Sequence, residues 1–191
     1  MTAQRRTVVV SGLPRSGTSM MMAMLQAGGL AVLTDAIRQA DADNPKGYYE
    51  FERVKQLEYD ASWLDDADGK AVKVISQLVQ HLPRQHDYKV VFMLRNMDEV
   101  LASQRQMLIR RGRPTDAASD ETLAQVFDQH LVQVREWIEA QPNMQVLYID
   151  YGEVLDQPVE LAQRVNDFLG GGLDVTAMAS VVDKRLHRQR Q

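Results

Sequence analysis

Near the start of the chain, a short apolar run leads into a glycine-containing loop and then into a helical pattern. Thr7–Ser11 is apolar almost throughout, which is typical of a strand buried on both faces of a parallel sheet. Thr18–Ala27 is predicted to be a helix, and Gly28 is suited to end it. The first N–H groups of a helix have no partner within the helix, so they favour an anion in the preceding loop. The sequence therefore predicts an α/β fold with an anion site at its first loop.

The loop residues explain how an anion would be held. Gly12 and Gly17 lack a Cβ, so the backbone there can curl tightly. Arg15 supplies a permanent positive charge, while Thr18 and Ser19 place hydroxyls on the first helical turn. The spacing matches the nucleoside-triphosphatase motif G-x-x-x-x-G-K-[ST], except that Thr18 stands where that motif has its lysine. The substitution argues against hydrolysis of a nucleoside triphosphate.

The rest of the chain alternates short β-branched runs with longer amphipathic stretches, which indicates βαβ units. Strands are expected at Thr7–Ser11, Ala71–Ile75, Lys89–Leu94 and Gln145–Asp150, and helices at Thr18–Ala27, Tyr49–Trp63, Met97–Arg110, Asp120–Ala140 and Val159–Leu169. We expect one three-layer α/β/α domain over residues 1–191, with a central, mainly parallel sheet of about four to five strands.

Composition narrows the function further. The chain has 191 residues and no cysteine, which excludes disulfides, thiolate metal sites and cysteine nucleophiles. A net charge of −4 gives no basic field for nucleic acid, so we expect no nucleic-acid partner. No apolar stretch approaches the roughly 20 residues of a membrane span, and a cytoplasmic location is expected. The four histidines form no ligand-spaced cluster, so no metal is expected; they are His81, His86, His130 and His187.

The whole loop resembles the 5′-phosphosulfate-binding loop of sulfotransferases that use 3′-phosphoadenosine 5′-phosphosulfate (PAPS). Its residues follow the pattern G-x-P-[KR]-S-G-T-[ST] from Gly12 to Ser19, with arginine where many members have lysine. The resemblance implies that PAPS is the cofactor and that six loop residues bind it: Pro14, Arg15, Ser16, Gly17, Thr18 and Ser19. It also implies that Arg15 contacts the bridging oxygen during transfer.

A second motif resembles the part of these sulfotransferases that binds the 3′-phosphate. A strand ends in Arg95, and Ser103 follows eight residues later on a predicted helix. The resemblance implies that this pair binds the phosphate that distinguishes PAPS from ordinary adenine nucleotides. The alternative is that Arg95 makes a salt bridge that caps the helix.

A third segment, Val146–Pro158, resembles the family's strand with a Tyr-Glu-Asp-Leu continuation, and Phe168-Leu169-Gly170 completes the match. We expect it to be structural, although Asp150 also stands where a Walker-B acid would. Gly170–Gly172 reads as a helix stop. The basic C-terminal residues either reach the 3′-phosphate or form a solvated tail; they are Lys184, Arg185, Arg188 and Arg190.

The general base is the least defined part of the predicted site. Many family members have a histidine shortly after a lysine on the second strand, but here Lys73 is followed by Val74 and Ile75. A loose similarity to carbohydrate sulfotransferases favours Glu50 as the base, with Glu52 second. The alternative is that Glu50 only opens a helix.

The resemblance as a whole implies transfer of a sulfuryl group from PAPS to a hydroxyl or amine of a small-molecule or carbohydrate acceptor. Two alternatives remain open at this point. One is an atypical kinase or nucleoside-triphosphate hydrolase, and the other is a nucleotide-binding module without catalysis.

Overall fold

The computed structural model describes residues 6–35, 37, 47–114 and 119–183. In these ranges five strands form one sheet: β1 (Thr7–Gly12), β2 (Val32–Leu33), β3 (Ala71–Lys73), β4 (Tyr88–Leu94) and β5 (Met144–Asp150). Their order across the sheet is β2-β3-β1-β4-β5, and every neighbouring pair is parallel. The predicted parallel sheet is confirmed. The strand β2 was not among the four that the sequence predicted. It has only two residues, which is too short for a periodic pattern.

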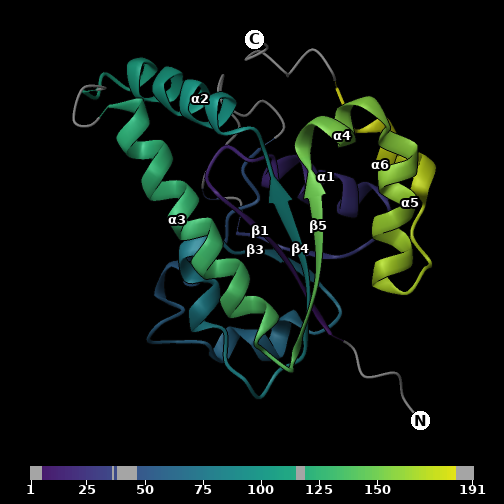
Figure 1. The fold of residues 1–191 in the computed structure, drawn as a ribbon. Coiled ribbons are helices and arrows are strands. Elements are labelled where there is room, and N and C mark those ends of the chain that lie inside the picture. The colour runs from purple at the N-terminus through teal and green to yellow at the C-terminus, as the bar shows by residue number, and fades with distance from the viewer. Residues whose placement is uncertain (1–5, 36, 38–46, 115–118, 184–191) are drawn as a thin grey trace.

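Helices connect the strands and cover both faces of the sheet (Figure 1). The described residues form α1 (Thr18–Ala27), α2 (Met97–Arg110), α3 (Asp120–Glu139), α4 (Tyr151–Asp156), α5 (Pro158–Leu169) and α6 (Val175–Ser180), with 3-10 segments η1 (Glu52–Gln56), η2 (Ser62–Ala67) and η3 (Ser76–His81). The predictions for α1, α2, α3 and α5 are confirmed to within one residue at each end. The helices α4 and α6 have six residues each, and the sequence analysis did not predict them.

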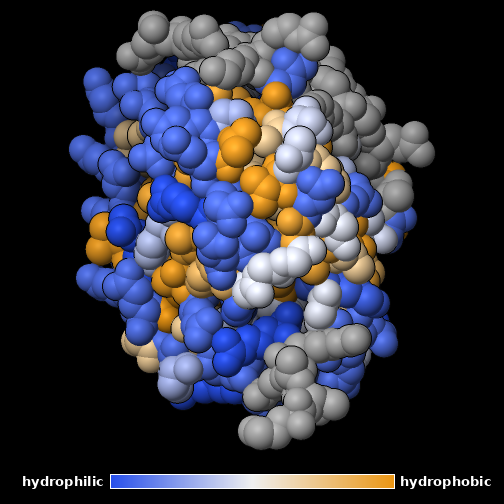
Figure 2. All heavy atoms as spheres, turned by 90° about the vertical axis from the view of Figure 1, so that its right-hand side faces the viewer, coloured by the Kyte–Doolittle hydropathy of each residue, from blue (hydrophilic) through white to orange (hydrophobic). Residues whose placement is uncertain are grey.

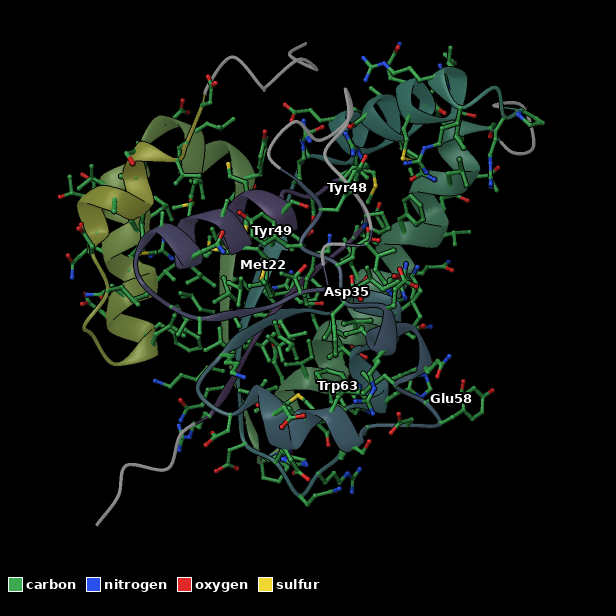
Figure 3. The ribbon with its side chains drawn as sticks, turned by 180° about the vertical axis from the view of Figure 1, so that it is seen from behind. Met22, Asp35, Tyr48, Tyr49, Glu58 and Trp63 are labelled. Carbon is green, nitrogen blue, oxygen red and sulfur yellow. The ribbon has the colours of Figure 1, made fainter. Side chains whose placement is uncertain are left out.

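Alternation along the strands sorts the core into two layers. Val8 and Val10 of β1 pack with α1, α5 and α6, while Val9 packs on the opposite face with the η segments and α3. Successive side chains of a strand point to opposite faces, so a strand that is buried throughout feeds both layers. Met22 and Trp63, labelled in Figure 3, are buried in the first and second layer respectively. Met21, Met22 and Met24 of α1 are fully buried, so they belong to the core together with Trp63.

The layer formed by α5 and α6 is not wholly enclosed. The face seen in Figure 2 has a patch of hydrophobic residues surrounded by hydrophilic ones. Val159 of α5, for example, is more than half exposed. None of the described helices is long and apolar enough to cross a membrane.

The predicted helix over Tyr49–Trp63 is wrong. This segment contains η1 and the start of η2, separated by a turn, and Tyr49 has a left-handed backbone with φ of 53°. The Asp60 carboxylate accepts hydrogen bonds from the Ser62 backbone and hydroxyl, which offers the chain an alternative to helical bonds. The apolar spacing was still informative, because Val54 and Leu57 are buried in the core.

Candidate active site

The site forms where β1, β3 and β4 reach the same edge of the sheet. Parallel strands bring their C-terminal ends together, and open α/β sheets bind ligands there. The loop between β1 and α1 makes the centre of this edge. Ser16 N–H donates to the Leu13 carbonyl at 3.1 Å, which closes the loop, and Met21 N–H donates to Gly17 at 3.1 Å to begin α1. The N-cap of α1 is Gly17, which has no side chain to cap the first-turn N–H groups. Those groups therefore face the loop.

Both loop glycines are required by their surroundings. Gly12 has φ of 147°, and a Cβ there would lie 2.5 Å from the Ser16 hydroxyl oxygen and 2.6 Å from the Met93 carbonyl. Gly17 has φ of 97°, and a Cβ there would lie 2.5 Å from Tyr151 Cδ2. The loop is thus a tight cradle, as the sequence predicts. The buried Ser16 hydroxyl has no hydrogen-bond partner within the described residues.

Arg15 lies at the tip of this cradle in a left-handed conformation, with φ of 73°. Such a backbone is uncommon for a residue other than glycine and needs support from its surroundings. Its Nε donates to the Ser103 hydroxyl of α2 at 2.9 Å. Two residues predicted from separate motifs, 88 positions apart, are therefore in direct contact.

Arg95 follows β4 and forms a hydrogen bond to the loop. Its Nη1 donates to the Arg15 carbonyl at 3.0 Å, and its Nε donates to Glu99 at 2.9 Å. Its guanidinium lies over the Tyr151 ring, 4.3 Å from the centroid. Burial raises the pKa of the Tyr151 phenol, so this ring is a neutral platform at neutral pH. Arg95 pairs with Glu99 in the first turn of α2, which is the helix-capping salt bridge that the sequence analysis held as an alternative, and it also contacts the loop.

Lys73 also lies at this edge of the sheet; the sequence analysis named it only because the family's histidine is missing after it, and gave it no role. It ends β3, and its side chain is only 8% exposed. Its ammonium donates to the Tyr48 carbonyl, contacts Ser19 Oγ at 3.4 Å and lies 3.9 Å from the Glu50 carboxylate. The available signal was a lysine at the end of a fully apolar strand, because a lysine is seldom buried without a partner.

Glu50 directly follows Tyr48 and Tyr49, which are labelled in Figure 3, and its carboxylate lies 3.9 Å from the Lys73 ammonium. Glu50 is 23% exposed, so its carboxylate is accessible from outside. Glu52, the second candidate base, instead pairs with Lys55 on the surface at 2.6 Å. The structure thus brings Glu50 to the loop through Lys73 and places Glu52 in a separate surface ion pair.

The sulfotransferase domain family matches residues 5–189, which is nearly the whole chain. The chain belongs to the sulfotransferase domain family. No curated protein sequence matches it significantly.

Solved structures share the fold of this sulfotransferase-family chain at low identity. Mouse sulfotransferase SULT7A1, complexed with PAP, is 18% identical with a TM-score of 0.60, covering 94% of this chain and 64% of the mouse chain. Sulfotransferase STF1 from Mycobacterium tuberculosis is 16% identical with a TM-score of 0.58, covering 96% and 72%. A sulfotransferase domain from the curacin biosynthetic pathway is 14% identical with a TM-score of 0.53, covering 94% and 78%. The chain therefore spans less than two thirds of the mouse enzyme's length.

Two further predicted features of this sulfotransferase-family chain have structural roles, and one lies outside the described residues. Asp150 caps α4 by accepting from Glu153 N–H at 3.1 Å, which is the structural role. Gly170 ends α5 with a left-handed φ of 104°, as a helix stop requires. Within the described ranges, no group of three or more acidic or histidine side chains is placed so that it could hold a metal ion. The basic tail, from Lys184 to Arg190, lies outside the described residues.

Proposed function

We propose that this chain transfers a sulfuryl group from PAPS to a hydroxyl or amine of a small-molecule or carbohydrate acceptor, and that residues 1–191 act as one domain. The observation that carries the proposal is the meeting of the two motifs at Arg15. Its side chain bonds Ser103, and its carbonyl accepts from Arg95. A loop that binds one phosphate is thereby joined to two residues suited to a second phosphate.

The geometry of the cradle supports a nucleotide cofactor. Backbone N–H groups at Gly17 and Thr18 would hold the 5′-phosphate, because no side chain caps the first turn of α1. Arg95 and Ser103 would hold the 3′-phosphate from the α2 side. When bound, PAPS supplies an activated sulfuryl group on its 5′-phosphate.

The protein's own side chains would then stabilise the charge of the leaving group and accept the proton of the acceptor. Arg15 and Lys73 supply positive charge where the leaving phosphate oxygen gains negative charge as its bond to sulfur breaks. Glu50 takes the proton of the acceptor hydroxyl as its oxygen forms the new bond to sulfur. Lys73 contacts both Ser19 and Glu50, so it links the cofactor side of the site to the acceptor side.

Cofactor class is tested by calorimetric titration with adenosine 3′,5′-bisphosphate in the presence of a chelator, and with ATP plus Mg²⁺. We expect the bisphosphate to bind without metal and Arg95→Ala to weaken binding about tenfold or more, because a charged hydrogen bond is worth about 1.5–3 kcal/mol. Arg135→Ala is the matched control, because Arg135 also stacks on a tyrosine, at 4.6 Å from the Tyr148 ring, but belongs to α3.

Three outcomes separate the possible functions. Binding of the bisphosphate, with sulfuryl transfer to a member of an acceptor panel, supports the proposal. Binding without transfer to any acceptor would favour a non-catalytic nucleotide module. Binding of ATP with Mg²⁺ alone would refute the proposal and favour a kinase or hydrolase. A thermal melt of Arg95→Ala, followed by circular dichroism, tests whether the variant still folds, so that lost binding can be told from lost folding.

The base is tested separately with Glu50→Gln and its neighbour Glu52→Gln. Loss of a general base costs typically 10²- to 10⁴-fold in turnover, and the amide preserves shape, so Glu50→Gln should lose transfer and keep bisphosphate affinity. Glu52→Gln should leave both unchanged, because Glu52 pairs with Lys55 on the surface. Equal turnover in Glu50→Gln and the unmodified chain would remove Glu50 as the base.

A further inference from the structure

A second pocket lies at the opposite edge of the sheet from the nucleotide loop. Its volume is about 370 Å³, at the low end for small-molecule sites. It is formed where β1 and β4 begin and where the chain turns after α5: Arg6, Val8, Leu30, Gly69, Lys89, Leu169, Gly171 and Leu173 line it. β1 runs from this pocket to the loop, and its six residues span roughly 20 Å. The two sites are therefore separate.

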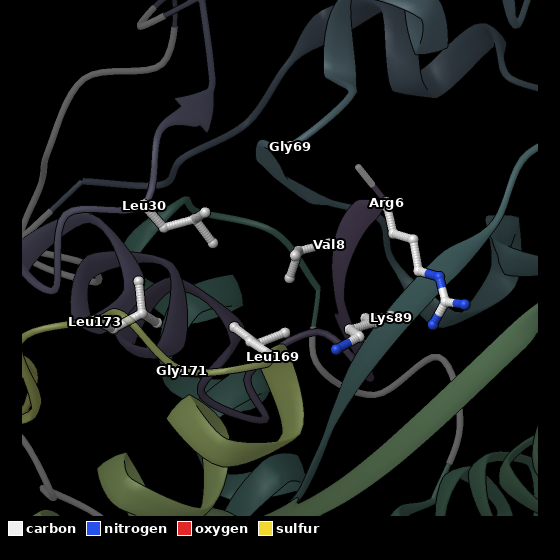
Figure 4. Close-up of a pocket in the computed structure, with 8 residues that line it drawn as sticks. All are labelled: Arg6, Val8, Leu30, Gly69, Lys89, Leu169, Gly171 and Leu173. Atoms are coloured by element: carbon white, nitrogen blue, oxygen red, sulfur yellow. The ribbon is translucent and has the colours of Figure 1, made fainter. Parts of the chain in front are cut away.

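The walls of the pocket differ in character (Figure 4). Arg6 and Lys89 lie on one side, and Leu30 and Leu173 lie on the other. The three lining leucines are only half-buried, so they present apolar surface to the pocket. Cations on one wall and aliphatic side chains on the other suit a molecule with a charged head and an apolar body.

The two cations are poorly neutralised by the protein. Within the described residues, the Lys89 ammonium donates one hydrogen bond, to the Phe168 carbonyl at 2.7 Å, although it carries three donors. Arg6 has one acidic neighbour there, Asp87, at 4.0 Å, which is beyond hydrogen-bond distance. Burial lowers the pKa of Lys89, and the charge of Arg6 lowers it further. The pocket therefore carries positive charge that a bound anion would offset.

The glycine run after α5 brings backbone close to this charge. Gly170, Gly171 and Gly172 all have left-handed backbones, with φ of 104°, 85° and 91°. One such residue is enough to end a helix. A Cβ on Gly170 would approach the Lys89 ammonium to 3.8 Å, while a Cβ on Gly171 would have no neighbour within 4 Å. The run thus leaves open space beside Lys89 that side chains would otherwise occupy.

We propose that this pocket binds a small organic anion, with its single acidic head between Lys89 and Arg6 and its short aliphatic body against Leu30, Leu169 and Leu173. Two donor positions on Lys89 and the fork of Arg6 would bind a carboxylate or sulfate head. The apolar body would cover leucine surface that is now exposed to water. The inference does not depend on the proposed sulfuryl transfer, because none of the lining residues belongs to the nucleotide site.

The test is a titration of the full chain with sodium octanoate and with octyl sulfate, followed by methyl NMR. We expect the methyl signals of Val8, Leu30, Leu169 and Leu173 to shift, while Leu13 at the nucleotide loop reports any binding there. Octan-1-ol and acetate serve as probes that lack the charge and the apolar body respectively. We expect each to bind at least about tenfold more weakly than octanoate.

Variants identify which side chains supply the positive charge that holds the anion. Lys89→Met keeps the aliphatic stem and should weaken octanoate about tenfold or more, and Arg6→Gln should weaken it too. Lys55→Met is the control, because Lys55 pairs with Glu52 on the surface and does not line the pocket. In the unmodified chain, saturating octanoate should raise the pKa of Lys89, measured from its ¹³Cε signal.

Four results would overturn the proposal. They are shifts confined to Leu13, equal binding of octanoate and octan-1-ol, unchanged affinity in Lys89→Met, or a Lys89 pKa that octanoate does not move.

Discussion

Gly17→Ala tests the contact between the loop that joins β1 to α1 and the Tyr151 ring. A Cβ at this position would lie 2.5 Å from Tyr151 Cδ2 and 3.1 Å from Cε2, and Gly17 has φ of 97°. Two separate penalties are expected. The left-handed backbone costs an L-residue about 1–2 kcal/mol, and forcing a methyl group against a packed ring costs about 1–3 kcal/mol. The free energy of unfolding should therefore fall by about 2–5 kcal/mol.

Gly29→Ala isolates the first penalty. Gly29 follows the C-cap of the same helix with nearly the same φ, 95°, and a Cβ there would meet no atom within 4 Å. The expected loss is therefore the backbone term alone, about 1–2 kcal/mol. The difference between the two variants measures the resistance of the Tyr151 ring to displacement.

Urea unfolding followed by circular dichroism gives both values, with matched slopes confirming that the unfolded states are comparable. The same pair of variants should differ in affinity for adenosine 3′,5′-bisphosphate, because Tyr151 also supports the Arg95 guanidinium. If Gly17→Ala and Gly29→Ala lose equal stability, Tyr151 moves aside at no cost. The ring would then not be a rigid platform, and the reasoning would fail.

Two further predictions concern other elements. Asn96→Ala should lower the free energy of unfolding by about 0.5–2 kcal/mol in urea, because the Asn96 side chain caps α2 by accepting from Glu99 N–H at 3.2 Å; no measurable loss would contradict the cap. His130, bonded to Ser76 at 2.9 Å, has a pKa lowered by burial. Below its ordinary value of 6.5, the unfolded chain takes up a proton that the folded chain resists, so stability falls as pH drops from about 7.5 to about 5.5. His130→Asn should lose less stability than the unmodified chain over this interval, and parallel losses would exclude His130 as a source.

The features that the sequence predicted well are those set by residues close together in the chain. The loop from Gly12 to Ser19 is defined by its own glycines, and β1 and β4 each contain a continuous apolar run, Val8–Val10 and Val90–Leu94. The helices α2 and α3 have caps next to them, at Asn96 and Ser119. Local spacing is sufficient in these cases, because the residues that set the pattern belong to one element.

The features that the sequence missed depend on contacts between distant segments. Lys73 meets Tyr48 and Ser19 across 25 and 54 positions, and no local pattern announces those contacts. The 3-10 segments between Glu52 and Ala67 have the burial of a helix but not its backbone. Side-chain bonds such as that of Asp60 to Ser62 decide the backbone there, and periodicity does not detect them.

Arg15 shows why the second motif matters beyond its own charges. A left-handed arginine costs about 1–2 kcal/mol, yet its side chain and its carbonyl are each held by a partner from the β4–α2 unit. Ser103 fixes the direction of the guanidinium, and Arg95 fixes the carbonyl, so the conformation is imposed from outside the loop. Replacing Arg95 would therefore remove a proposed ligand for the nucleotide and also release the Arg15 carbonyl. Ser103→Ala would release the side chain of Arg15 but leave its carbonyl held. The two variants should differ accordingly, with Arg95→Ala losing more affinity than the removal of one phosphate contact explains.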